Sequence, residues 1–95
     1  MLTVSRGDTI VSVGKKEAIL ATVFADPVRA NLRWADIEHM LRGFGGTVTE
    51  RRGSRVAVVL NGVVAVFHRP HPSPQASRAQ VRSVREFLRN AGVVP

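Results

Sequence analysis

The chain has 95 residues, of which 14 are Lys or Arg and 7 are Asp or Glu, so its formal net charge is +7. A chain of this length forms one domain and buries too little surface for the deep core of a large enzyme. It has no cysteine, which excludes disulfide frameworks, cysteine-ligated zinc sites and thiol nucleophiles. The excess of base over acid favours a polyanionic partner or an acidic protein partner. A basic surface without such a role is the alternative.

The first residues and the longest apolar run bear on where the chain resides. Residues 1–14 show neither a helical period nor an apolar run of signal-peptide length. We expect them to form an N-terminal extension, a candidate for disorder, followed by a single domain over residues 15–95. The longest apolar stretch, residues 56–67, is interrupted by Asn61-Gly62 and is unsuited to a membrane span. We therefore expect a cytoplasmic protein without membrane contact.

Two stretches in the first half of the chain have helical spacing. From Lys15 onward, apolar residues three and four positions apart predict a short helix that ends before Asp26-Pro27. A longer amphipathic helix is predicted to end at Gly45-Gly46, with its apolar face formed by Trp34, Ile37, Met40, Leu41 and Phe44. Glu38, His39 and Arg42 are expected to point away from this face, with His39 in solvent.

Three strands are predicted next. Residues 47–51 can form a short strand, and Arg52-Gly53 then marks a turn. The β-branched runs at residues 54–60 and 63–68 flank Asn61-Gly62. This arrangement is typical of a hairpin closed by a two-residue type I′ turn.

A last helix follows a loop that contains three prolines. Ser77 and Gln80 have the spacing of a capping box, and Gly92 stands where a helix-terminating glycine belongs. The two longer helices and three strands give the order αβββα. The predicted fold is α+β, a two-layer sandwich with both helices on one face of a three-stranded antiparallel sheet, plus the short N-terminal helix.

The two-residue loop fixes the register of the hairpin. Counting outward from the loop pairs Val56 with Phe67 on the face expected to be buried, and Arg55 with His68 on the open face. A cation and an imidazole side by side near the rim of a sheet could contact one phosphodiester together. An ordinary solvated pair of side chains is the alternative.

The other two histidines give weaker signals. His39 is expected on the exposed face of a helix, and His71 lies between two prolines, three residues after His68. These prolines prevent helical spacing of His68 and His71, and no Asp or Glu is close in sequence to complete a ligand shell. We therefore expect no metal and no other cofactor.

The last helix carries four arginines spaced four, three and four residues apart, namely Arg78, Arg82, Arg85 and Arg89. This spacing places them in one strip beside the apolar face. Guanidinium groups in a row can follow a phosphate backbone, although such a run is often only a solvated helix face. Further positive charge comes from Lys15, Lys16, Arg51 and Arg52. The aromatic residues occupy mainly apolar faces, so contacts to phosphates and 2′-hydroxyls are favoured over base stacking.

Three segments together resemble the HicA family of bacterial toxins. They are Trp34-Ala35-Asp36-Ile37 with Met40-Leu41 and Phe44-Gly45, Arg52-Gly53-Ser54 at the turn into the second strand, and Val81-Arg82-Ser83-Val84 with Ala91-Gly92-Val93. The resemblance covers roughly residues 34–93 and implies a fold like that of double-stranded-RNA-binding domains. It also implies a messenger-RNA interferase, which binds and cleaves messenger RNA and is neutralised by a partner antitoxin, HicB.

The chain departs from this pattern at one position. The resemblance implies a catalytic histidine directly after Gly53-Ser54, where this chain has Arg55. Metal-independent cleavage needs a base for the 2′-hydroxyl proton, an acid for the leaving oxygen and cations for the phosphate charge. Arg55 can serve only as the cation. We therefore predict that His68 supplies the imidazole, with His71 nearby, and that RNA is contacted by Arg51, Arg52, Ser54 and the helix arginines.

Two other interpretations stay open. A chain without the motif histidine could bind RNA or its antitoxin and cleave nothing, which predicts salt-sensitive RNA affinity without degradation. Alternatively, its basic surface could dock only an acidic antitoxin, which predicts no RNA retention even at low salt.

Overall fold

The computed structural model describes residues 3–5, 7–8 and 14–95. Its elements are β1 (Thr3–Ser5), β2 (Gly7–Asp8), α1 (Lys15–Val23), α2 (Trp34–Gly43), β3 (Thr47–Glu50), β4 (Arg55–Leu60), β5 (Val63–His68) and α3 (Arg78–Asn90). β1 pairs with β2, and the other strands form an antiparallel sheet in the order β3-β4-β5. The expectation of a disordered extension falls largely on residues 1–2, 6 and 9–13, which lie outside the described residues, and it stays a prediction.

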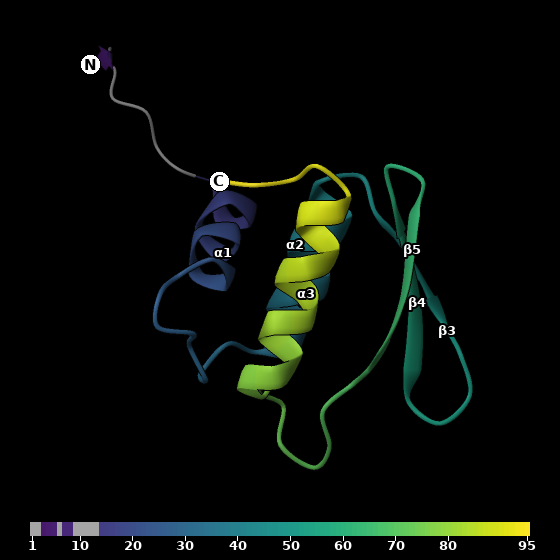
Figure 1. The fold of residues 1–95 in the computed structure, drawn as a ribbon. Helices are drawn as coiled ribbons and strands as arrows, with labels where there is room; N and C mark the ends of the chain where they lie inside the picture. The colour runs from purple at the N-terminus through teal and green to yellow at the C-terminus, as the bar shows by residue number, and fades with distance from the viewer. Residues whose placement is uncertain (1–2, 6, 9–13) are drawn as a thin grey trace.

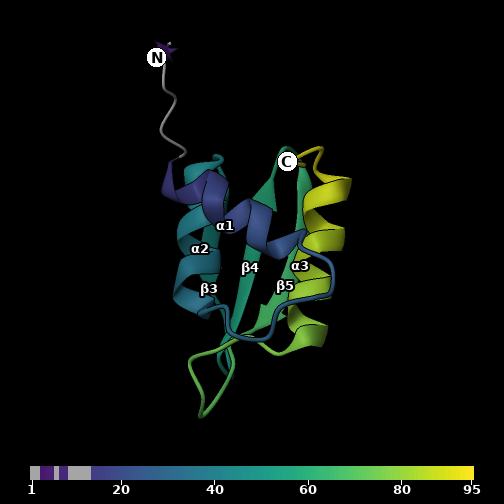
Figure 2. The same ribbon diagram turned by 90° about the vertical axis from the view of Figure 1, so that its left-hand side faces the viewer.

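The helices and the sheet form consecutive layers. In Figure 1 the sheet stands on one side, α2 and α3 lie in the middle, and α1 lies beyond them. Figure 2 shows α1 in front of the two longer helices, with the sheet behind. The predicted α+β sandwich is therefore confirmed, with both longer helices on one face of the sheet. The short helix α1 adds a third layer, because it buries Ile19, Leu20 and Val23.

The hairpin has the predicted turn and register. Asn61 and Gly62 both have positive φ, 51° and 81°, as a type I′ turn requires. Val56 pairs with Phe67 and Arg55 pairs with His68, as counted from the sequence. The Asn61 side chain also donates a hydrogen bond to the carbonyl of Ala91 at 2.8 Å, which ties the turn to the end of α3.

The two faces of the sheet differ in burial as the alternation predicts. Val56, Val58, Leu60 and Phe67 are buried against the helices. The Phe67 ring lies between the rings of Trp34 on α2 and Phe87 on α3, with centroids 5.8 and 5.7 Å away. No described helix covers the opposite face, where Val59, Val64 and Val66 are 41%, 64% and 53% exposed, although Ala57 among them is only 4% exposed.

The start of α3 and the ends of α2 and α3 carry the signals that the sequence indicates. The Ser77 hydroxyl accepts a hydrogen bond from the Gln80 amide, and the Gln80 side chain accepts one from the Ser77 amide, which completes the capping box of α3. Gly45 and Gly92 have positive φ just beyond α2 and α3. One expectation for α2 is wrong. Glu38 is only 6% exposed, because its carboxylate has buried partners described below.

Candidate nucleic-acid interface and active site

Arg55 and His68 are directly opposite each other in the β4–β5 register, at the end of the hairpin remote from Asn61-Gly62. Both side chains are exposed. The Nε of Arg55 donates to the carbonyl of Arg52 at 3.0 Å, so its terminal nitrogens, which have no partner among the described residues, are available to an anion. The backbone confirms the predicted juxtaposition, and the catalytic role of either side chain stays a prediction.

A tight turn places further polar groups beside Arg55. Gly53 and Ser54 are both in the left-handed region, with φ of 67° and 64°, which favours glycine at the first of these positions. The amide of Arg51 donates to the carbonyl of Arg55 at 2.8 Å, and the amide of Arg55 donates to that of Arg52 at 3.3 Å. The turn therefore presents Arg51, Arg52, Ser54 and Arg55, all exposed, at the same end of the sheet.

Arg69, the residue after His68, holds this end of the sheet together. Its amide donates to the carbonyl of Ser54 at 2.9 Å, which continues the β4–β5 pairing by one residue. Its guanidinium donates to Glu38 on α2, from Nε at 2.8 Å and from NH2 at 3.2 Å. NH1 donates to both carboxylate oxygens of Glu50 on β3, at 2.8 and 2.7 Å. Arg69 thus links α2 and all three strands next to His68.

Glu38 is a buried carboxylate within this network. The indole N–H of Trp34 donates to it at 2.6 Å, and Arg42 lies 3.5 Å away. Burial alone would raise the pKa of Glu38, but hydrogen bonds from Arg69 and Trp34 and the charges of Arg69 and Arg42 outweigh it, so the pKa lies below its ordinary value. Hydrogen bonds to Glu38 and Glu50 likewise raise the pKa of Arg69. The network therefore stays ionised at neutral pH.

Sequence reasoning missed Glu38 and Arg69. A local signal existed for Glu38, because residues four apart on a helix lie on the same side, and Glu38 follows Trp34 by four positions. Arg69 is separated from Glu38 by 31 positions in the chain. Nothing local in the sequence indicates that contact.

His68 and His71 do not share one concavity. His68 belongs to a groove of about 520 Å³ between β5 and α3, whereas His71 lines a separate hollow of about 640 Å³ formed by the proline-rich loop and the start of α3. Gln80 borders both, and its side-chain amide donates to the His68 carbonyl at 2.8 Å. His71 is exposed, so a shared role with His68 requires a substrate that reaches across Gln80.

The arginines of α3 divide into two groups. Arg78 and Arg82 are exposed. Arg85 instead donates to the carbonyls of Val23 and Ala25 at 3.0 and 2.8 Å, where it caps the end of α1. Arg89 lies over the Phe24 ring at 5.5 Å and 3.7 Å from Glu86. The predicted strip of four arginines is therefore partly occupied by contacts within the chain.

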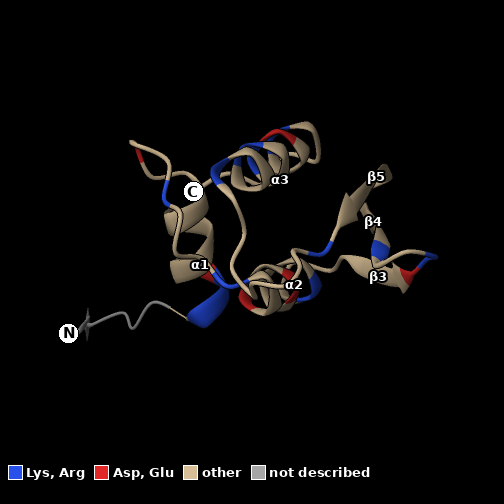
Figure 3. Ribbon diagram, turned by 90° about the horizontal axis from the view of Figure 1, so that it is seen from below, with Lys and Arg blue, Asp and Glu red and all other residues tan. Residues whose placement is uncertain are grey.

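The lysines at the start of α1 also have partners in the fold. Lys16 donates to the carbonyl of Gly43 at 3.0 Å and lies 5.1 Å from the centre of the Phe44 ring, so it caps α2. Lys15 lies 3.6 Å from Asp36. Seen from below in Figure 3, positive charge is distributed over α1, α3 and the sheet near the β3–β4 turn. Arg51 and Arg52 of that turn, with Arg78 and Arg82, are exposed, and their side chains have no partner within residues 14–95. Arg89 is exposed as well but contacts Phe24 and Glu86.

The comparison with protein families decides the family. Residues 34–93 match the family described as the HicA toxin of bacterial toxin-antitoxin. The chain belongs to the HicA toxin family. No curated protein and no solved structure matches it.

The HicA match begins at Trp34, the first residue of α2, and includes the sheet and α3. It therefore contains Arg55, His68, Glu38 and Arg69, whereas the α1 layer precedes it. As a member of this family the chain is a toxin of a toxin–antitoxin system, which implies an antitoxin partner in general.

Two further observations concern the described part of this HicA toxin. It contains no group of three or more His, Asp or Glu side chains that could hold a metal ion. None of the helices in that part is both long and apolar enough to cross a membrane.

Proposed function

We propose that this HicA family toxin binds messenger RNA at the end of the sheet that carries Arg55 and His68, and cleaves it as an endoribonuclease that needs no metal ion. The observation that carries the proposal is the pairing of these two exposed residues across β4 and β5. It brings a fixed cation and an imidazole to one site. The partner antitoxin is proposed to be HicB-like.

The proposed reaction is transfer of the phosphate to the neighbouring 2′-oxygen. His68 takes the proton of the 2′-hydroxyl, whose oxygen then forms a bond to phosphorus as the bond to the 5′-oxygen breaks. The products are a 2′,3′-cyclic phosphate and a 5′-hydroxyl. The guanidinium of Arg55 stabilises the charge that grows on the phosphate, since its terminal nitrogens are available.

The leaving 5′-oxygen needs a proton. His71 is the proposed donor, because a protonated imidazole can act as a general acid and its hollow adjoins the His68 groove at Gln80. The scissile phosphate would then lie over the rim between the two concavities.

The surrounding charge supports this location. The two acids at this end of the sheet, Glu38 and Glu50, are both paired with Arg69, which weakens their repulsion of a phosphate. Arg51 and Arg52 are exposed in the adjoining turn. We propose that these two residues, Ser54 and the exposed arginines of α3 contact the RNA backbone on either side of the scissile bond.

The decisive experiment replaces His68 by Ala and follows growth and transcript integrity, with and without the gene adjacent to that of the toxin. The expected result is growth arrest and RNA cleavage by the natural chain, relief by the neighbouring gene, and loss of cleavage in His68→Ala. His39→Ala is the matched control, because His39 is an exposed histidine on α2 that is not among the residues proposed to contact or cleave RNA. Cleavage that survives His68→Ala would contradict the assignment.

A second candidate function follows from Arg55 itself. The family resemblance implies a histidine at this position, so the chain could bind RNA or its antitoxin without cleaving RNA. This candidate predicts that purified protein retains RNA at low salt, leaves it intact, and behaves identically after His68→Ala. Degradation by the purified chain that disappears in His68→Ala rejects it.

A further inference from the structure

β5 is an edge strand with hydrogen-bonding groups that face outward. It pairs with β4 on one side only. In a hairpin closed by a two-residue turn, Leu60 and Val63 exchange hydrogen bonds, so the alternate residues Val64, Val66 and His68 direct their backbone groups away from β4. The His68 carbonyl has Gln80 as its partner. The remaining outward amides and carbonyls of these three residues have no partner within residues 14–95.

This edge lacks the features that protect exposed strands. Natural sheets guard their edges with short strands, Lys, Pro or bulges. β5 has six residues in continuous register with β4, and the first five are Val, Val, Ala, Val and Phe. The opposite edge, β3, has only four residues and ends in Glu50. An unprotected apolar edge is therefore confined to one side of the sheet.

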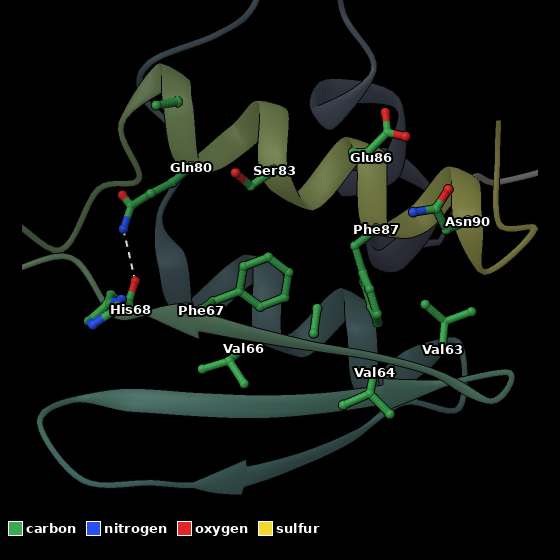
Figure 4. A pocket seen from close by; sticks show the side chains of 12 residues that line it. Val63, Val64, Val66, Phe67, His68, Gln80, Ser83, Glu86, Phe87 and Asn90 are labelled. Carbon is green, nitrogen blue, oxygen red and sulfur yellow. Dashed lines mark hydrogen bonds between the residues drawn. The ribbon is translucent and has the colours of Figure 1, made fainter.

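A groove runs alongside this edge. It has a volume of about 520 Å³ and lies between β5 and α3. In Figure 4 the rings of Phe67 and Phe87 extend into the space between strand and helix, whereas Val64 and Val66 point to the other side of the strand. The α3 wall includes Ser83, a small neutral residue, and Glu86, whose carboxylate lies 3.7 Å from the guanidinium of Arg89. An extended chain beside β5 would thus find apolar surface on both of its faces.

We propose that β5 accepts an additional strand from an acidic partner protein. Alternate residues of that strand are apolar and enter the groove. On its other face, apolar residues lie beside Val64 and Val66, and a carboxylate lies beside His68 and Arg55. Such strand addition takes its affinity from backbone hydrogen bonds and its specificity from alternate side chains.

The net charge of the chain favours a strand from an acidic partner over a strand from a second copy of the chain. Each copy carries a net charge of +7, so pairing two β5 strands would bring like charges together, whereas an acidic partner is attracted. The antitoxin implied by the family match is the partner that fits. The proposal rests on the proposed function only in naming an antitoxin as the partner. It does not require that the chain cleaves RNA.

The test uses the full chain and, as the probe, the purified product of the adjacent gene. Val66→Pro removes an outward amide without touching the β4 pairing, since proline is tolerated where an edge N–H faces solvent. Ser83→Trp fills the groove from the helix and leaves β5 unaltered. Val59→Lys is the matched control, because Val59 lies on the same open face but in the central strand β4.

The expected result is that Val66→Pro and Ser83→Trp each weaken binding about tenfold or more by calorimetry, while Val59→Lys changes it by less than about threefold. In the natural complex the amides of Val64, Val66 and His68 should exchange hydrogen at least about tenfold more slowly than in the free chain. Thermal melting of each variant confirms folding. If Val66→Pro fails to fold, the binding measured for Ser83→Trp tests the proposal.

Several outcomes would overturn the proposal. One is undiminished binding by both Val66→Pro and Ser83→Trp, or loss of binding only in Val59→Lys. Another is unchanged hydrogen exchange at the amides of Val64, Val66 and His68. The proposal also fails if β5 is protected in a dimer of the chain alone, or if the adjacent gene product does not bind. RNA cleavage by free Val66→Pro is measured separately and should equal that of the natural chain. If the natural chain cleaves no RNA yet binds through β5, only the catalytic proposal fails.

Discussion

The guanidinium of Arg69 meets the buried carboxylate of Glu38 with two hydrogen bonds, of 2.8 and 3.2 Å. The pair connects α2 to the segment that directly follows His68. A charged pair of this kind is costly to separate, because removing Arg69 leaves the buried carboxylate with only the Trp34 indole and Arg42 as partners. The geometry of the proposed site and the stability of the fold therefore depend on the same contact.

Replacing Arg69 by Met should destabilise the chain by about 3 kcal/mol, since Glu38 would stay buried without its main partner. Urea denaturation of the natural chain and the variant measures the difference in free energy of unfolding. Arg42→Met is the matched control. Arg42 is exposed and lies 3.5 Å from the same carboxylate, so its loss should cost less than about 1 kcal/mol. Equal losses in the two variants would show that Arg69 has no special role.

The same carboxylate predicts how stability depends on pH. The pKa of Glu38 lies below its ordinary value of 4.5 in the folded chain, so folding favours the ionised form. Its contribution is fully present above the unfolded-state pKa and is lost as the pH falls through the lower folded-state pKa. Glu38→Gln does not show this loss of stability at low pH, because glutamine does not ionise. Denaturation curves across the acid range should therefore show the two proteins converging below pH 4.5, and a constant difference would contradict the assignment.

The parts of the fold that were predicted from sequence depend on local rules. Asn61-Gly62 fixed the turn, and the alternation of side chains on each strand then fixed the pairing of Arg55 with His68. The capping box of Ser77 and Gln80 similarly marked the start of α3. Each of these signals lies within a few residues, or within one hairpin whose loop length determines the register.

The contacts that sequence reasoning missed join residues far apart in the chain. Arg85 and Val23 are 62 positions apart, and the packing of α1 that brings them together has no local signature. Helical spacing predicts that the four arginines share one side of α3, but it does not reveal that Arg85 contacts the end of α1. Glu38 was misplaced for a similar reason, because a hydrogen-bonded partner from another element made its burial possible.

Arg85 is predicted to be structural. Its removal leaves the carbonyls of Val23 and Ala25 without their donor and removes a cation near the Phe24 ring. We expect Arg85→Ala to lower the free energy of unfolding by about 1 to 2 kcal/mol, with faster hydrogen exchange in α1. Arg78→Ala is the control, because Arg78 is exposed at the first residue of α3. If the two variants are equally stable, Arg85 does not stabilise the end of α1.

The salt dependence of RNA affinity should separate the arginines that bind phosphate from those that support the fold. Each phosphate contact releases counterions, so the log of the affinity falls with the log of the salt concentration by about 0.7 per contact for a single strand. Arg82→Ala should therefore reduce this slope by about 0.7 and weaken binding to all sequences. Arg85→Ala should leave the slope unchanged, since its guanidinium is occupied by the end of α1.

Arg29→Ala controls for the loss of one positive charge, because Arg29 is exposed in the loop between α1 and α2 and outside the proposed interface. Filter binding to an unstructured RNA over a series of salt concentrations gives the slopes. Only a loss at Arg82 that exceeds the loss at Arg29 supports a contact along α3. Equal slopes for both variants would mean that net charge, rather than the position of the arginines on the helix, governs attraction to RNA.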